Sequence, residues 1–347
     1  MRVLFVSRWK FNPYQKRLVA ELRAAGVEVI ERDFDAASRA STIAEERPDV
    51  LHLQNIHAGL RSIGSVVRFM HALLVTRIAR VKVVWTVHDL QDHDNRTPRL
   101  DAMTSKFTSR FADALIVHCD AVHALVRNAN VTTIHHGQLI DEYPNHVSRG
   151  DARRELGLGH DDFVFLLLGW IRAYKGIADL IDAFERLELP GARLLLAGSA
   201  AEDELRMLVV RRASANARIL FHPGAVDAER VQLYLNACDV VVLPYRRILT
   251  SGAPILAMSF AKPCIAVRRG CMDAMLDEEG SFLYEPDAAD ALLHAMQRAF
   301  RERESLEAMG RHNLQRVASW RWDEIAAQTI GVYRSVLRPS ARGAAAR

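Results

Sequence analysis

The stretch that decides the fold is Gly169-Trp170-Ile171-Arg172-Ala173-Tyr174-Lys175-Gly176. It follows the unbroken apolar run 163–168, which is typical of a buried parallel strand, and it precedes residues 177–187, which have the spacing of an amphipathic helix. In an open α/β sheet, such a turn lies at the carboxyl edge, where ligands bind. Its glycines allow close approach of a ligand, and Arg172 and Lys175 can neutralise a phosphate or diphosphate. The alternative is an ordinary loop with solvated charges.

A second loop of similar character follows the apolar run 240–243. It contains Tyr245 and then the turn Thr250-Ser251-Gly252, which opens an apolar helical segment. Free backbone N–H groups, hydroxyls and the positive end of a helix dipole make such a turn a ready anion site. Helix capping by the Thr or Ser needs no ligand, and both roles are compatible. Together with Arg172 and Lys175, this turn predicts a diphosphate clamp.

The whole chain alternates strands and helices in two series. Its 347 residues, 50% of them hydrophobic, are enough for two domains. The alternation predicts the α/β class, with two doubly wound Rossmann-like domains that face a cleft. We expect domains over 1–148 and 149–318, a terminal helix over 319–337 and a disordered tail over 338–347.

Composition excludes several classes of protein. Charged residues make up 25% of the chain, which argues against disorder. The net charge of +4 suits an anionic ligand or membrane surface, and no dense Lys/Arg run predicts binding to nucleic acid. The first apolar run is too short for a signal peptide, and no run reaches the length of a membrane span. We therefore expect a cytoplasmic protein.

Several motifs together resemble the GT-B glycosyltransferases. Residues 169–176 resemble the diphosphate-binding loop of that family, residues 237–244 the strand that leads to its sugar-nucleotide site, and residues 319–323 the aromatic start of its last helix. The resemblance covers nearly the whole chain. It implies a GT-B fold with an acceptor-binding first domain, a second domain that binds a nucleotide sugar, and a terminal helix that crosses back to the first domain.

The chain differs from the retaining GT-B enzymes at one conspicuous point. Retaining enzymes of the glycogen-synthase-like group (family 4) carry two glutamates eight residues apart at the second loop, where this chain has Ile248 and Leu256. The chain is more similar to the xanthan-pathway β-mannosyltransferase type, through residues 12–14, 49–53, 88–96, 136–137 and 171–176. That implies inverting transfer of a hexose, with mannose from GDP-mannose favoured, to a saccharide or lipid-linked saccharide in polysaccharide or glycoconjugate synthesis. The alternatives are a retaining family-4-like enzyme that uses a UDP- or GDP-sugar, and an idle protein that only binds a nucleotide sugar.

A loop rich in histidine and aspartate, residues 88–94, follows the predicted strand 82–87. An inverting transfer needs a base that takes the proton of the acceptor hydroxyl. A metal site or an acidic surface turn is the alternative, but the cations of the clamp already counter the phosphate charge, so we expect a metal-independent enzyme without a cofactor. His88 is expected to contact the donor. The candidates for the base are Asp89, Asp92, His93 and Asp94.

The remaining site assignments follow from the same resemblance. For acceptor binding we name Asn12 and Tyr14. His136-Gly137 can line the donor pocket or be structural, and Glu285 can bind the ribose or simply end a strand. The residues assigned to donor binding are Gly137, Gly169, Arg172, Lys175, Tyr245, Thr250, Ser251, Gly252 and Glu285.

The segment 60–82 combines apolar and basic residues. Packing of a helix against the sheet accounts for an apolar face. A basic interfacial surface is the alternative, because acceptors of this group are often lipid-diphosphate-linked sugars at the inner membrane face. Peripheral contact with an anionic membrane is therefore a hypothesis. The apolar positions are Ile63, Val66, Val67, Met70, Leu73, Leu74 and Ile78, and the basic ones are Arg61, Arg68, Arg77, Arg80 and Lys82.

Overall fold

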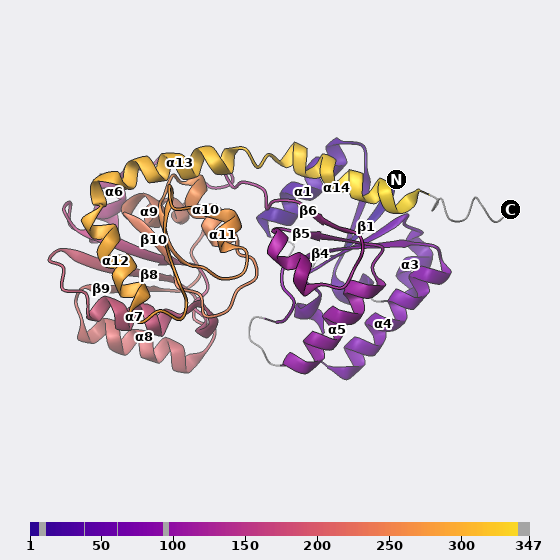
Figure 1. Ribbon diagram of the computed structural model, residues 1–347, viewed down its shortest axis with the longest axis horizontal. Coiled ribbons are helices and arrows are strands. Elements are labelled where there is room, and N and C mark those ends of the chain that lie inside the picture. Colours follow the sequence, from indigo (N-terminus) through magenta and orange to yellow (C-terminus); the bar gives the residue numbers. More distant parts are fainter. Residues whose placement is uncertain (7–11, 38, 61, 93–96, 339–347) are drawn as a thin grey trace. The chain divides into compact units, whose positions relative to one another are not determined.

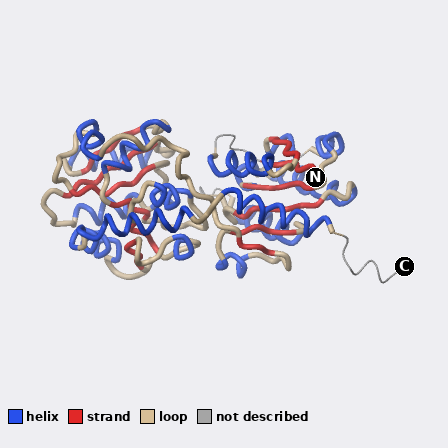
Figure 2. Tube along the Cα trace, turned by 90° about the horizontal axis from the view of Figure 1, so that it is seen from above, coloured by secondary structure: helices blue, strands red, loops and turns tan. Residues whose placement is uncertain are grey.

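The computed structural model describes residues 1–6, 12–37, 39–60, 62–92 and 97–338. The chain forms two compact units (Figure 1). Unit 1 comprises Met1–Gly137 and Trp320–Arg347, and unit 2 comprises Gln138–Ser319. Each unit contains a six-stranded parallel sheet flanked by helices (Figure 2). Residues 339–347, where we expected a disordered tail, lie outside the described residues.

The sheet of unit 1 has the strand order β2-β1-β3-β4-β5-β6. Its strands are β1 (Arg2–Val6), β2 (Glu28–Arg32), β3 (Val50–Gln54), β4 (Lys82–Val87), β5 (Ala114–Val117) and β6 (Val131–Thr133). Its helices are α1 (Pro13–Ala24), α2 (Phe34–Ala37), α3 (Ala40–Glu46), η1 (Ile56–Gly59), α4 (Ile63–Ile78), α5 (Pro98–Phe111), η2 (Asp120–Leu125) and α14 (Trp322–Leu337).

The last helix of the chain belongs to the core of unit 1. Helix α14 packs against α1, and Ile325, Ile330 and Tyr333 are buried among residues from the first strands. Because the chain returns to unit 1 only after residue 319, this core joins segments from both ends of the sequence.

The sheet of unit 2 has the strand order β12-β11-β10-β7-β8-β9. Its strands are β7 (Phe163–Leu168), β8 (Ala192–Gly198), β9 (Ile219–Pro223), β10 (Val240–Leu243), β11 (Cys264–Val267) and β12 (Ser281–Tyr284). Its helices are α6 (Arg149–Glu155), η3 (Ala173–Lys175), α7 (Ile177–Glu185), α8 (Asp203–Ala215), α9 (Ala228–Ala237), α10 (Gly252–Ser259), α11 (Met272–Met275), α12 (Ala291–Arg301), η4 (Arg303–Ser305) and α13 (Leu306–Ala318).

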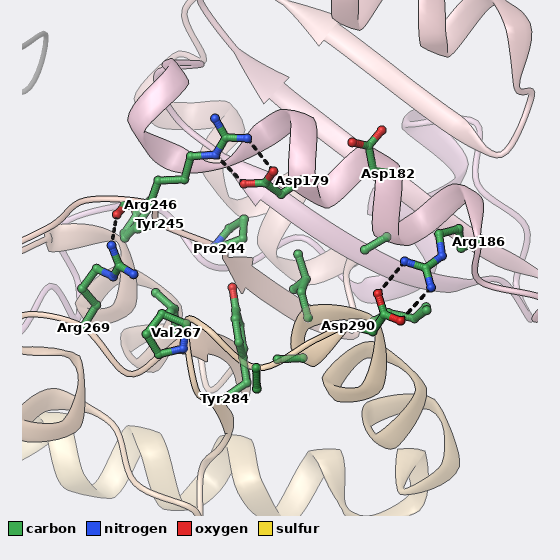
Figure 3. Close-up of a pocket in the computed structure, with 16 residues that line it drawn as sticks. Asp179, Asp182, Arg186, Pro244, Tyr245, Arg246, Val267, Arg269, Tyr284 and Asp290 are labelled. Carbon is green, nitrogen blue, oxygen red and sulfur yellow. Dashed lines mark hydrogen bonds and ion pairs between the residues drawn. The ribbon is translucent and has the colours of Figure 1, made fainter.

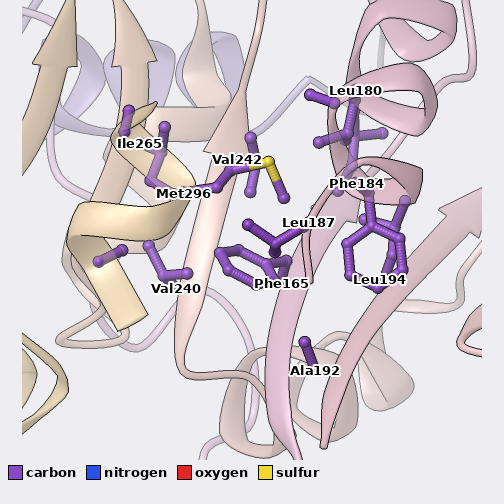
Figure 4. Packing of buried hydrophobic residues seen from close by; sticks show 14 of the residues in the cluster. Phe165, Leu180, Phe184, Leu187, Ala192, Leu194, Val240, Val242, Ile265 and Met296 are labelled. Atoms are coloured by element: carbon purple, nitrogen blue, oxygen red, sulfur yellow. The ribbon is translucent and has the colours of Figure 1, made fainter. Parts of the chain in front are cut away.

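The core of unit 2 explains why its central strands are apolar throughout. Phe165 of β7 and Val242 of β10 pack with Phe184 of α7 and Met296 of α12 on one face of the sheet (Figure 4). Strands β7 and β10 are neighbours in the middle of the sheet, so helices cover both of their faces and no polar alternation remains.

The described part of the chain contains no helix with both the length and the apolarity that a membrane span requires.

Candidate active site

The two cationic loops predicted from the sequence lie against each other in unit 2. Gly176, which has a φ of +71°, ends the first loop, and a Cβ added there would lie 2.0 Å from the carbonyl oxygen of Pro244. The backbone N–H of Arg246 donates to the carbonyl of Tyr174 at 2.8 Å. The loop after β7 and the loop after β10 therefore touch at the carboxyl edge of neighbouring strands, as an anion site built from both would require.

Lys175 is the most unusual group of this site, because its side chain is only 9% exposed. Its Nζ lies 5.9 Å from the ring centroid of Tyr245, and no carboxylate among the described residues pairs with it. Burial, together with the positive charge of Arg172, lowers the pKa of Lys175 to about 8. A buried ammonium without a paired carboxylate among the described residues is suited to receive an anionic ligand.

Gly169 makes room for this ammonium. Its φ is +110°, and a side chain on it would begin 3.4 Å from Lys175 Nζ. Arg172 is partly exposed, with its guanidinium 5.4 Å from the ring of Trp170. The first loop thus offers one buried and one partly exposed cation.

The second loop contributes the N-terminus of α10. Ser251 caps this helix, because its Oγ accepts a hydrogen bond from the N–H of Ala253 at 3.2 Å. The hydroxyl of the buried Tyr245 lies 3.2 Å from Ser251 Oγ, while Thr250 is buried and Gly252 is exposed. The capping role that the sequence allows is therefore present. The N-terminus of α10 lies beside the Tyr245 ring, which is also near Lys175 Nζ.

A cavity of about 430 Å³ lies beside the second loop (Figure 3). It is lined by Tyr245 and Arg246 but not by Arg172 or Lys175. Arg246 forms two hydrogen bonds of 2.5 and 2.6 Å with Asp179, so carboxylates already engage its positive charge. The cavity is consequently less suited to a diphosphate than the region around Lys175.

Glu285 follows β12 and lies 3.4 Å from Nε of Arg268. Arg268 also pairs with Asp273 and Glu278. The structure therefore places Glu285 at the edge of a surface ion-pair network, and its contact with a ribose stays a prediction.

Unit 1 gathers three histidines at the carboxyl edge of its sheet. His88, His118 and His136 follow the neighbouring strands β4, β5 and β6. The ring of Tyr14 lies 4.9 Å from His88, 5.4 Å from His118 and 4.9 Å from His136, measured between centroids. The sequence points to His88 and His136 but not to His118, because a single His after a short strand has no distinguishing pattern.

Hydrogen bonds fix the tautomers of this cluster. His118 Nδ1 lies 2.8 Å from the carbonyl oxygen of Ile134, so Nδ1 carries the hydrogen and donates. His118 Nε2 is then the acceptor for His88 Nδ1–H at 3.2 Å. The proton of a neutral His88 therefore sits on Nδ1, and its Nε2 carries the lone pair.

These imidazoles are neutral at pH 7. Burial lowers the pKa of His118 to about 3 and that of His136 to about 4. Burial and the neighbouring imidazoles hold the pKa of His88 well below its usual value. The cluster therefore offers uncharged donors and acceptors, which suit a sugar hydroxyl better than a phosphate.

The structure describes two of the four base candidates in the loop after His88. Asp89 and Asp92 are partly exposed, whereas His93 and Asp94 lie outside the described residues. The N–H of Asp92 donates to Asp101 Oδ2 at 2.9 Å, and the buried Asp101 also accepts from Thr97. Asp101, on α5, thus anchors the loop through the backbone of Asp92. The sequence did not predict this role.

Asp101 is ionised in this position. Burial raises the pKa of its carboxyl, but the His57 ring 3.8 Å away and the hydrogen bonds from the N–H of Asp92 and from Thr97 outweigh that effect, so the pKa lies below its usual value. His57 in turn contacts Ser105 through Nε2 at 2.9 Å. The Asp101 carboxylate therefore restrains the loop at Asp92, one of the candidates for the base.

The two acceptor-binding candidates have structural roles. The side chain of Asn12 caps α1 by accepting from the N–H of Tyr14 at 3.0 Å, and the Tyr14 ring is buried in the histidine cluster. Gly137 lies against Trp322, because a Cβ there would sit 2.4 Å from the indole. Contacts of these residues with an acceptor or donor stay predictions.

Nowhere in the described ranges do three or more His, Cys, Asp or Glu side chains form a group able to hold a metal ion.

Comparison with known proteins agrees with this architecture. Residues 162–302 match the family "Glycosyl transferases group 1". The chain is 30% identical over 261 residues to a GDP-mannose:glycolipid 4-beta-D-mannosyltransferase of Xanthomonas campestris pv. campestris, which covers 72% of this chain and 71% of the relative. The chain belongs to the group 1 glycosyltransferases. This glycosyltransferase is also 24% identical over 327 residues to a D-inositol 3-phosphate glycosyltransferase of Corynebacterium urealyticum, over 87% of this chain and 76% of the relative.

Solved structures confirm the fold expected for this glycosyltransferase. Sucrose-phosphate synthase from Thermosynechococcus elongatus aligns with a TM-score of 0.76 at 19% identity, over 97% of this chain and 99% of that one. The Anabaena HepE protein in complex with UDP-glucose aligns with a TM-score of 0.77 at 17% identity, over 96% and 100%. The glycosyltransferase has the GT-B fold, and its α/β class and family are as the sequence predicted.

Proposed function

We propose that this glycosyltransferase transfers mannose from GDP-mannose, with inversion, to a saccharide or lipid-linked saccharide. The supporting observation is the 30% identity to a GDP-mannose:glycolipid 4-beta-D-mannosyltransferase over more than two thirds of both chains. A β-linked product from an α-linked nucleotide sugar requires inversion at the anomeric carbon. The absence of the paired glutamates at Ile248 and Leu256 also favours inversion over the retaining alternative.

In this proposal, unit 2 holds the diphosphate of the donor. Lys175 and Arg172 neutralise it, and the N-terminus of α10 behind Ser251 supplies further positive potential. As the bond between the anomeric carbon and the diphosphate oxygen breaks, negative charge grows on the leaving GDP. Cations already held in a buried site stabilise that charge without reorganisation, which is the role a metal ion would otherwise fill.

Unit 1 would supply the base and the contact with the donor sugar. The acceptor oxygen attacks the anomeric carbon while its proton passes to a carboxylate, for which Asp89 and Asp92 are the described candidates. His88, neutral and with its Nε2 lone pair, would accept a hydrogen bond from a sugar hydroxyl. The cytoplasmic location stays a prediction.

Transfer and stereochemistry can be tested together. The purified chain is incubated with GDP-mannose or UDP-glucose and a lipid-linked saccharide acceptor in the presence of a metal chelator, and the anomeric coupling of the product is read by NMR. We expect GDP release, acceptor-dependent turnover and a β-linked mannose. An α-linked product would show a retaining enzyme. Donor binding without transfer or hydrolysis would show an idle binding protein.

A matched pair of variants tests the leaving-group site. Lys175→Met should lower turnover at least about 100-fold, by analogy with the loss of one preorganised electrostatic group. Lys262→Met is the control, because Lys262 is a partly buried lysine of the same unit that donates to the carbonyl of Cys238 instead. Near-normal turnover of Lys175→Met, or equal losses in both variants, would refute the assignment.

A further inference from the structure

Helix α4 of unit 1 is apolar on two opposite faces. Its inward face, which includes Val66, Phe69 and Leu73, is buried against the sheet. Packing of a helix over the sheet accounts for that face alone. A helix with apolar residues on two opposite faces is normally buried on both, whereas this one is buried on its inward face only.

The outward face carries an apolar stripe that protein does not cover. Ile63, Val67, Leu74 and Ile78 are 76, 59, 53 and 84% exposed, and Met70 between them is partly exposed. Their spacing of three or four residues aligns all five along one side of the helix. We call these five residues the outer stripe. Contiguous apolar surface of this kind marks a contact site for another molecule or a membrane.

Helix α5 presents positive charge on the surface next to the outer stripe. Arg99, Lys106 and Arg110 are exposed and share one side of α5, which we call the basic stripe. Helices α4 and α5 lie side by side (Figure 1). The guanidinium of Arg77 on α4 is 4.5 Å from the ring centroid of Phe111 on α5.

Acidic residues are almost absent from this surface. Residues 62–82 contain no Asp or Glu, and residues 97–112 contain only Asp101, which is 1% exposed. Asp113, whose side chain is 12% exposed, pairs with Arg77 and Lys82, whereas no ion pair of Arg68 or of the basic stripe is found among the described residues. Helices α4 and α5 thus offer an apolar centre, positive flanks and no exposed carboxylate of their own, which is complementary to lipid tails below anionic headgroups.

We propose that the outer stripe of α4 and the basic stripe of α5 form a docking surface for an anionic phospholipid bilayer. A second copy of the chain is a poorer occupant, because a two-fold contact would place like charges opposite each other. Nucleic acid is poorer too, because the exposed isoleucines and leucine match neither phosphates nor stacked bases. Both helices begin at the carboxyl edge of the sheet, where His88 lies, so the surface ends at the edge that carries the candidate base.

The inference does not require the proposed function, since lipid binding is measured without donor or acceptor. The full chain is floated with vesicles of phosphatidylcholine alone or of phosphatidylcholine with phosphatidylglycerol. We expect binding to the anionic vesicles only, and weaker binding as salt is added. Binding to neither vesicle, or equally to both, would overturn the proposal.

Exposed-site variants separate the two stripes without disturbing the core. Leu74→Glu should reduce the partition coefficient on anionic vesicles at least about tenfold, and Lys106→Gln roughly fivefold, the effect of one cation near such a surface. Met207→Glu on α8 is the control for an exposed apolar residue elsewhere, and it should bind as the parent does. Equal binding of Leu74→Glu and the parent would contradict the proposal. So would a lipid-free dimer, seen by light scattering, that Leu74→Glu dissociates, because a second copy would then be the occupant.

Discussion

Replacing the buried lysine should make the protein more stable while it removes activity. Lys175→Met keeps the length and flexibility of the side chain and removes its charge. The pKa of Lys175 falls from 10.5 to about 8, because burial disfavours its charged form. At about 1.36 kcal/mol per pKa unit, holding the ammonium there lowers the free energy of unfolding by roughly 3 kcal/mol below pH 8.

Lys175→Met does not recover the whole of this free energy of unfolding. The contact of Lys175 Nζ with the ring of Tyr245 is lost, which costs about 0.5–1 kcal/mol. The net gain at pH 7 is then about 2 kcal/mol. For a unit of this size, that corresponds to a rise of roughly 4–8 °C in the unfolding midpoint.

The sign of the pH dependence makes this prediction specific. The folded state holds Lys175 at a lowered pKa, so from pH 8 to 10.5 it binds fewer protons than the unfolded state, and the parent gains stability as the pH rises. The advantage of the variant should therefore shrink toward pH 10.5. Thermal and urea unfolding of both proteins at pH 7 and pH 10 measure this. The control Lys106→Met, at an exposed lysine, should change stability at neither pH. A destabilised Lys175→Met at pH 7, or a gain that is independent of pH, would refute the reasoning.

Three other perturbations have defined outcomes. Gly137→Ala places a methyl group against the indole of Trp322 and should lower the free energy of unfolding by about 1–3 kcal/mol. Gly331→Ala in α14, where a Cβ meets nothing within 4 Å, should raise the free energy of unfolding by up to about 1 kcal/mol. Equal effects of the two substitutions in thermal melts would be inconsistent with this packing. Burial lowers the pKa of His52 to about 3, so the free energy of unfolding of the parent should fall by about 2 kcal/mol through this residue between pH 6.5 and 5. Urea titrations of His52→Gln should show a free energy of unfolding that depends less on pH. An unchanged pH dependence would count against a neutral buried imidazole. Asp101→Asn removes the carboxylate charge that holds the loop of the base candidates at Asp92. It should lower kcat with little change in the affinity for GDP, and an unchanged kcat would rule out the anchoring role of Asp101.

The sequence predicted the framework of unit 2 well, because its signals are local. The apolar run 163–168 is a central strand to the residue, and the two loops that follow β7 and β10 touch as expected for neighbouring strands. Parallel pairing brings carboxyl ends to one edge, so loop composition alone was enough to group them.

Helix α5 was not predicted, and its packing gives the reason. Its buried face consists of Asp101, Thr104, Ser105, Thr108 and Ser109, so no apolar periodicity marks it. A polar face can be buried there because Thr104, Ser105 and Ser109 donate to nearby carbonyls and Asp101 accepts from the N–H of Asp92.

Of the three clustered histidines, the sequence pointed to His88 and His136 but not to His118, for a similar reason. His118 acquires its role from Ile134 and His88, which are 16 and 30 residues away in the sequence. Contacts between residues so far apart leave no pattern in a single sequence. The exposure of the outer stripe likewise needed the structure, because apolar residues on both faces of α4 look like an ordinary core helix in the sequence.

The most direct test of the central claim, that Lys175 binds the donor diphosphate, is proton uptake on GDP binding. A bound diphosphate should raise the pKa of Lys175 from about 8, so binding at pH 8 should take up roughly half a proton. Calorimetric titration in buffers of different ionisation enthalpy measures this uptake. We predict uptake in the parent and in Lys262→Met, with uptake lost and affinity at least about tenfold weaker in Lys175→Met. Equal uptake and affinity in all three proteins would contradict the account.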